Sequence, residues 1–165
     1  MMNSTLLLTV FIAAVTLVPC VLCLIVWGYV LAMAGFLRSA TAADVDPQEA
    51  GARYGLVFHD DLCATVTDAV RRMVLGLLAG LVLLTVWYFF AAVGEQARVM
   101  TMLNALAVLS GVMWLLSRLV EVITGLMART KTLATSRIRK ALRTAGLWHI
   151  LIWLLTIAAC WVLTL

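Results

Sequence analysis

The sequence predicts an all-α integral membrane protein with four transmembrane helices in one bundle. Its 165 residues are 65% hydrophobic and only 12% charged, and the mean hydropathy is +1.10. A soluble globule of this composition would expose much of its apolar surface to water. Four predominantly apolar stretches are each long enough to cross the ~30 Å hydrocarbon core of a bilayer. The composition therefore excludes disordered, disulfide-stapled, collagenous and soluble nucleic-acid-binding proteins.

The first predicted span covers residues 6–37 and contains no Asp, Glu, Lys, Arg or His. A helix of this length measures about 48 Å at ~1.5 Å per residue. We expect it to tilt, to project beyond the membrane or to bend at Pro19. The residues before it include no Lys or Arg, and its apolar run exceeds the ~7–15 residues of a signal peptide. We therefore expect a mature helix rather than a cleaved leader.

The remaining predicted spans cover residues 73–93, 99–127 and 147–165. Residues 94–98 form a short connection between the second and third spans, with one charge of each sign. The sequence has no internal repeat and no room for a second domain, so we predict a single domain over residues 1–165.

Loop charges predict the orientation of the bundle. The connection between the third and fourth spans carries bases and no acid: Arg129, Lys131, Arg137, Arg139, Lys140 and Arg143. The positive-inside rule places the loops 38–72 and 128–146 on the cytoplasmic or equivalent side and both termini on the opposite, non-cytoplasmic side. Segment 129–143 is expected to contact anionic lipid headgroups, and the acidic first loop either remains solvated or pairs with it. Several cellular membranes fit this charge bias equally well.

Arg118 and Glu121 are charged residues within the third span, where insertion scales assign each a penalty of about 2.5 to 3.5 kcal/mol. Their spacing of three places them on one helix face, so that each lowers the burial cost of the other. Polar and small residues also recur there every seven positions, at Asn104, Gly111, Arg118 and Gly125. We expect this face to point into the bundle, where the charged pair is either an interhelical pin or part of a ligand or anion site.

The second span offers a glycine motif and two arginines. Gly76 and Gly80 form a G-x-x-x-G frame that allows close helix approach. Arg71 and Arg72 either anchor the helix at the interface or join Arg118 in binding a carboxylate or phosphate. The candidate ligand-binding residues are Arg71, Arg72, Asn104, Arg118 and Glu121. The candidate packing residues are Gly76, Gly80, Gly111 and Gly125, and we predict no metal site and no cofactor.

The two histidines occupy unequal settings. His59 falls in the first loop, whereas His149 follows Trp148 at the predicted start of the fourth span. A haem between facing helices normally needs a ligand on each helix, so this arrangement argues against one. We expect His149 to be a hydrogen-bonded histidine at the membrane interface.

Pro19-Cys20-Val21-Leu22-Cys23 contains a C-x-x-C motif whose helical spacing places both sulfurs on one face. The motif resembles the quinone-reactive motif of the bacterial membrane disulfide-forming oxidoreductases, which implies thiol–disulfide exchange with a quinone. That family places its motif outside the membrane and needs a second reactive pair. Here the motif lies inside an apolar run, and Cys63 and Cys160 fall on opposite predicted sides. We therefore expect buried apolar cysteines.

A second resemblance involves the first loop and the third helix. Asp46-Pro47-Gln48-Glu49-Ala50 is similar to the Asn-Pro-Glu-Asp type segment of the membrane-associated proteins in eicosanoid and glutathione metabolism, the MAPEG family. Ser117-Arg118-Leu119 with Gly125 is similar to that family's arginine-bearing third helix. The resemblance implies a trimer of four-helix subunits that uses glutathione on lipophilic substrates, with Arg118 as the catalytic residue. The family's Arg-x-x-x-Asn-x-x-Glu signature is not retained in the corresponding segment, Asp61-Leu62-Cys63-Ala64-Thr65-Val66-Thr67-Asp68.

These observations predict a non-catalytic structural or accessory subunit of a membrane protein complex, because packing features are plentiful and the glutathione signature is missing. The alternative is a MAPEG-like glutathione-dependent transferase or isomerase, and a membrane thiol–disulfide or quinone oxidoreductase is a minor alternative. A transporter or channel would need more polar positions inside the spans. The expected partners are the lipid bilayer and either two further copies of the chain or a larger complex, with no nucleic acid.

Overall fold

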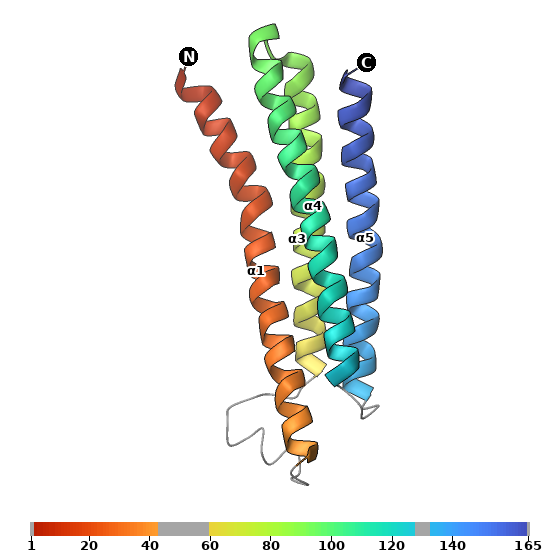
Figure 1. Cartoon of the computed structure of the whole chain (residues 1–165). Coiled ribbons are helices and arrows are strands. Elements are labelled where there is room, and N and C mark those ends of the chain that lie inside the picture. The colour runs from red at the N-terminus through yellow and green to blue at the C-terminus, as the bar shows by residue number, and fades with distance from the viewer. Residues whose placement is uncertain (1, 43–59, 128–132, 165) are drawn as a thin grey trace.

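The computed structural model describes residues 2–42, 60–127 and 133–164, with side chains described for 4–35, 64–126 and 139–164. Helices are the only regular elements in these segments: α1 (Met2–Ala42), α3 (Asp60–Phe90), α4 (Val93–Met127) and α5 (Leu133–Thr164) (Figure 1). Each contains a stretch long and apolar enough to cross a membrane: Ser4–Gly35, Ala64–Phe90, Val93–Leu126 and Arg139–Thr164. The predicted all-helical chain with four candidate spans is confirmed.

The four helices run side by side along one bundle (Figure 1). The start of α1, the turn between α3 and α4 and the end of α5 lie at the same end of it, which we call the turn end. The opposite end, which we call the loop end, holds the last residues of α1 and α4 and the first residues of α3 and α5. Helices α3 and α5 are therefore parallel to each other and antiparallel to α1 and α4.

The helices extend beyond the predicted spans. Helix α3 begins at Asp60 although its predicted span begins at residue 73, and α4 includes residues 94–98, which were predicted as a connection. The backbone amides of Glu95 and Gln96 donate to the carbonyl of Ala92 at 2.8 and 3.2 Å, which closes the turn tightly. Hydropathy locates the part of a helix that fits a hydrocarbon core, whereas backbone hydrogen bonding determines where the helix ends.

Each helix buries a seam whose residues alternate between spacings of three and four. In α3 the seam consists of Val66, Val70, Met73, Leu77, Gly80, Leu84 and Trp87, and Val74, Gly76 and Leu81 beside it are buried as well. In α4 it consists of Val99, Leu103, Leu106, Ser110, Met113, Ser117, Val120 and Thr124. This heptad spacing is typical of left-handed bundles, in which side chains of one helix insert between those of its neighbour. The core is therefore a set of facing seams, and the other helix faces point outward.

Threonines within these seams satisfy their hydroxyls inside their own helices. Thr16, Thr124 and Thr156 donate to the carbonyls four residues earlier, at 2.9, 2.7 and 2.7 Å. A bilayer core holds no water that would otherwise take these bonds. The buried threonines therefore pack as small side chains between helices without forming polar links across them.

Helices α1 and α3 approach closely beside Pro19. Because proline has no N–H, the carbonyl of Val15 lacks its usual partner four residues on. A Cβ placed on Gly76 of α3 would lie 2.6 Å from that carbonyl oxygen and 3.1 Å from Cγ of Pro19. One turn further along, Gly80 lies against the methyl group of Thr16. The G-x-x-x-G frame thus lets the α3 backbone cover the carbonyl that Pro19 leaves unpaired.

We expect Gly76→Ala to lower the free energy of unfolding by about 1–3 kcal/mol, because the added methyl group has to push α1 and α3 apart. Gly28→Ala is the matched control, since no side chain and no other helix lies within 4 Å of the position its Cβ would take. Alanine also favours a helix over glycine, so the control variant should be at least as stable as the parent protein. Reversible unfolding in mixed micelles measures both values, and equal stabilities would contradict the close contact.

Candidate functional site

The charged pair of α4 links this helix to α5. Arg118 Nη1 donates to Glu121 Oε2 at 2.7 Å, and Arg143 of α5 lies 3.5 Å from the other carboxylate oxygen of Glu121. The Glu121 side chain is only 17% exposed and that of Arg118 is 34% exposed, whereas that of Arg143 is 74% exposed. The sequence spacing therefore brings Arg118 and Glu121 into contact, and Arg143 adds an outer interhelical partner.

Glycines make room for the large side chains of this contact. A Cβ on Gly146 of α5 would lie 3.0 Å from both Cζ and Nε of Arg118. Conversely, a Cβ on Gly125 of α4 would lie 3.7 Å from Nη1 of Arg139, which belongs to α5. Each helix thus places an arginine over a glycine of the other. Gly146 was not among the glycines predicted from the sequence, since only its position opposite Arg118 gives it significance.

The indole of Trp153 extends this pattern toward the turn end. Its Nε1 would lie 3.2 Å from a Cβ on Gly111, and its ring stacks on Trp114 with centroids 6.5 Å apart and planes 3° from parallel. Gly111 and Gly125 are therefore at the α4–α5 contact, whereas Gly76 and Gly80 are at the α1–α3 contact. The four glycines predicted to serve packing divide between two interfaces.

Basic side chains of α5 surround Glu121 at the loop end. A cavity of about 250 Å³ is lined by Glu121, Arg139, Lys140 and Arg143. We call these four residues and their cavity the cationic pocket. Because the single carboxylate is already bonded to Arg118, the pocket has a surplus of positive charge. Guanidinium groups match planar carboxylate and phosphate oxygens, so the pocket has the chemistry of an anion site.

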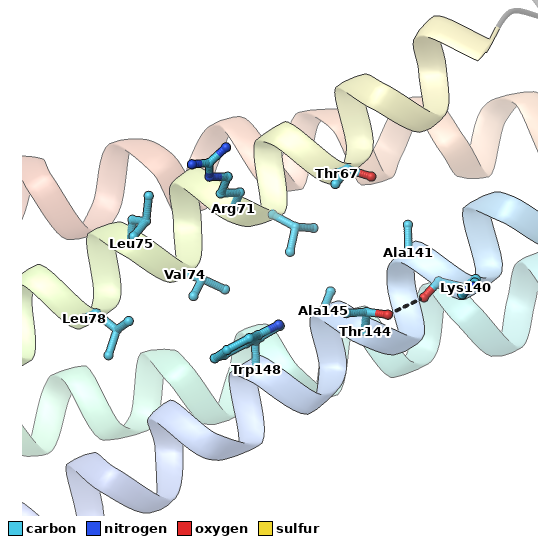
Figure 2. Close-up of a pocket in the computed structure, with 11 residues that line it drawn as sticks. Thr67, Arg71, Val74, Leu75, Leu78, Lys140, Ala141, Thr144, Ala145 and Trp148 are labelled. Carbon is cyan, nitrogen blue, oxygen red and sulfur yellow. Dashed lines mark hydrogen bonds between the residues drawn. The ribbon is translucent and has the colours of Figure 1, made fainter.

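A larger, mainly apolar groove lies between α3 and α5 (Figure 2). Its volume is about 620 Å³, and it is lined by Thr67, Val70, Arg71, Val74, Leu75, Leu78, Lys140, Ala141, Thr144, Ala145 and Trp148. We call it the α3–α5 groove. Thr144 donates its hydroxyl to the carbonyl of Lys140 at 3.0 Å, so this hydroxyl is satisfied within α5 (Figure 2). Lys140 lines both the groove and the cationic pocket, so the two spaces share this residue in their walls.

The three arginines predicted to bind one anion occupy three settings. Arg71 lines the α3–α5 groove. Arg72 pairs instead with Asp68 at 2.8 Å on the exposed side of α3, and Arg118 is engaged by Glu121. Figure 2 shows the guanidinium of Arg71 directed away from α5 and apart from Lys140 along the groove. The structure therefore does not bring the three arginines together, and Arg72 and Arg118 already have carboxylate partners.

Asn104 does not share the buried position expected for its seven-residue repeat. Its side chain is exposed, whereas its neighbour Leu103 is fully buried. Each later member of the repeat comes one position after a buried seam residue, namely Ser110, Ser117 or Thr124. The repeat therefore forms the edge of the seam rather than its centre. At Gly111, Arg118 and Gly125 this edge contacts α5, whereas at Asn104 it is exposed. The prediction that this face points into the bundle is wrong at Asn104.

His149 lies inside the bundle rather than at a solvated interface. Its residue is fully buried, and its ring meets that of Trp27 edge-on, with centroids 6.2 Å apart and planes at 72°. Neither ring nitrogen has a hydrogen-bond partner among the described residues, and neither does Nε1 of Trp27. The expectation of a hydrogen-bonded interfacial histidine is therefore wrong, because His149 continues the buried seam of α5 three residues before Ile152.

Cys20 and Cys23 are free thiols buried in the seam of α1. Their spacing puts both on the face that packs against the bundle, out of reach of a polar reactant. Burial also disfavours the thiolate that exchange chemistry requires. Their environment is that of small apolar side chains, and Cys63 lies outside the residues with described side chains.

Comparison of the chain with protein-family models, curated proteins and solved structures finds no match. Segment 46–50, which carries part of the MAPEG resemblance, lies outside the described residues, as do residues 129–131 of the basic loop. Among the residues with described side chains, no three His, Cys, Asp or Glu side chains are grouped as metal ligands. The cationic pocket and the α3–α5 groove are the sites on which a functional proposal can rest.

A double-mutant cycle tests the unequal coupling of Glu121 to its two arginines. We expect a coupling energy of about 1–3 kcal/mol between Arg118 and Glu121, because this bond is short, charged and largely buried. Between Arg143 and Glu121 we expect less than about 1 kcal/mol, since Arg143 is exposed. Both cycles use the substitutions Arg118→Gln, Arg143→Gln and Glu121→Gln, singly and in pairs. The free energy of unfolding of each variant is measured in mixed micelles. Equal couplings would show that the α4 pair is no stronger than the outer contact.

Proposed function

We propose that this chain is a non-catalytic structural or accessory subunit of a membrane protein complex. The observation that carries the proposal is the position of Arg118, the one residue expected to be catalytic. Its guanidinium lies against Gly146 and is bonded to Glu121, so it contributes to the α4–α5 contact. A group held in this way is not oriented toward a reactant. Burial of Cys20 and Cys23 against the bundle likewise supports a structural role for the thiols.

Helix α1 supports an assembly role because its N-terminal half has little cover. Figure 1 shows this part of α1 leaning away from the other helices. Large apolar side chains here are more than half exposed, among them Leu6, Leu7, Val10 and Phe11. Such a surface suits either lipid or a helix of another subunit. We propose that a neighbouring subunit, from a second copy or a different chain, packs beside α1.

The proposed orientation follows the charges at the loop end. Arg139, Lys140 and Arg143 all lie within the first turns of α5. The positive-inside rule assigns such a concentration of bases to the cytoplasmic or equivalent side. We propose that the loop end faces this side and that both termini face away from it. Anionic headgroups of the same leaflet are the proposed contacts of the basic segment.

Native mass after mild solubilisation tests the subunit proposal. The tagged full-length chain should elute from its native membrane together with a second protein at a fixed stoichiometry, in a particle larger than a homotrimer. A tagged unrelated four-helix membrane protein, expressed to the same level, controls for nonspecific capture. Recovery of the chain solely as a homotrimer would argue for the MAPEG-like assembly, and recovery as a monomer would contradict both proposals.

Glutathione separates the enzyme alternative from the subunit proposal. We expect millimolar glutathione to leave the melting temperature of the purified protein in detergent unchanged, because Arg118 is already bonded to a carboxylate. S-methylglutathione, which lacks a free thiol, distinguishes ligand binding from thiol exchange with the cysteines. A rise of several degrees with both compounds, lost in Arg118→Gln, would instead favour a glutathione-dependent transferase or isomerase.

A further inference from the structure

The α3–α5 groove has the length of one bilayer leaflet. Its lining on α3 runs from Thr67 near the loop end to Leu78. These residues are eleven positions apart, which corresponds to about 16 Å of helix at ~1.5 Å per residue. Half of the ~30 Å hydrocarbon core is about 15 Å. The groove thus extends from one end of the membrane-spanning region to about its midplane.

The groove is amphipathic along this length (Figure 2). Lys140 and Thr67 lie at the loop end, whereas Leu75, Leu78 and Trp148 lie deeper. On α5 the wall is formed by the small residues Ala141, Thr144 and Ala145, which leave the space between the two helices open. A ligand that fits has an elongated apolar part and a polar part at the loop end.

Charge specifies the polar part as an anion. Lys140 belongs to both the groove and the cationic pocket, and that pocket is also lined by Arg139 and Arg143. Arg71 also lines the groove, but Figure 2 shows its guanidinium directed away from α5 and apart from Lys140. Within the described part of the chain, neither Arg139 nor Lys140 takes part in an ion pair. The acid in this group, Glu121, is bonded to Arg118.

We propose that the α3–α5 groove is a binding site for one anionic glycerophospholipid. An acyl chain lies along Val74, Leu78 and Trp148, and the headgroup phosphate is bound by Lys140 together with the other bases of the cationic pocket. A phosphate suits this set because arginine offers paired donors and lysine a compact charge. This assignment goes beyond the subunit role, which does not require a specific lipid.

Charge complementarity favours a lipid of this class over two other occupants. A zwitterionic lipid would place a second, positive charge beside the same bases. An apolar helix from another protein would fill the groove but leave the bases at its mouth without a counter-charge. An anionic phospholipid provides both an apolar chain for the groove and a negative charge for the bases. Such a lipid is available from the leaflet at the loop end.

Native mass spectrometry of the full-length protein, with two lipids of identical acyl chains, tests the assignment. We expect phosphatidylglycerol to bind at least fivefold more tightly than phosphatidylcholine. The double variant Arg139→Gln/Lys140→Gln should reduce this preference by about fivefold or more, because each base near a membrane surface strengthens anion binding by about that factor. Arg98→Gln, which removes an exposed charge near the turn end, should leave the preference unchanged.

A second pair of variants tests the apolar part. Ala141→Leu adds bulk to the groove wall and should weaken binding of both lipids without abolishing the preference. Ala105→Leu makes the same change at an exposed position of α4 and should have no effect. Because both substitutions favour a helix and neither alters a fully buried residue, folding is expected to persist, and circular dichroism verifies it.

Soluble sn-glycerol 3-phosphate distinguishes a lipid site from a site for free phosphate. It should fail to compete at millimolar concentration, because it lacks the acyl chain that the groove holds. Equal binding of the two lipids, or an unchanged preference in the Arg139→Gln/Lys140→Gln variant, would overturn the proposal. Effective competition by glycerol phosphate, with no effect of Ala141→Leu, would assign the bases to a soluble anion instead.

Discussion

The bond between Arg118 and Glu121 depends on the absence of a side chain at Gly146. A guanidinium in a membrane-spanning helix needs both a counter-charge and space. Glu121 supplies the charge at 2.7 Å, and Gly146 supplies the space, because a Cβ there would lie 3.0 Å from Cζ and Nε of Arg118. This contact fixes where α5 lies beside α4. Lys140 and Arg143, which precede Gly146 by about two turns and one turn, are thereby held at the loop end.

The same principle operates at the contact between α1 and α3, with a backbone group in place of a charge. Pro19 leaves the carbonyl of Val15 without its helical partner, and Gly76 lets the α3 backbone approach that oxygen. In both interfaces a glycine faces the polar group that is most difficult to bury. Close packing therefore stabilises the bundle and also compensates polar groups in a region where water is absent.

Properties that depend on local sequence were predictable, and those that depend on helix register were not. Apolar length predicts the four helices, and a spacing of three predicts the contact between Arg118 and Glu121. Gly146 and the burial of His149 were missed, because each is defined by which residue of another helix lies opposite. Asn104 was wrongly assigned, since a seven-residue repeat does not show whether it is the centre of a seam or its edge.

Ligand sites at helix interfaces are difficult to predict from sequence for the same reason. Lys140 lies near the start of α5 within a run of basic residues, and such a run is typical of an ordinary interfacial anchor. Its place in the walls of both the groove and the cationic pocket depends on how α3 and α5 pack, and these helices are not joined directly by a turn. Because no short turn joins α3 directly to α5, the backbone does not force these two helices together at the loop end.

Small residues therefore have two opposite effects in this bundle. Gly76 and Gly146 lie where helices are held close, and the missing side chain is replaced by atoms of the neighbouring helix. Ala141 and Ala145 line the α3–α5 groove, where a volume of about 620 Å³ is not filled by side chains. Apolar walls without partner atoms lose dispersion contacts. In a bilayer the molecules present to restore these contacts are lipids, and the bases at the groove mouth favour the anionic ones among them.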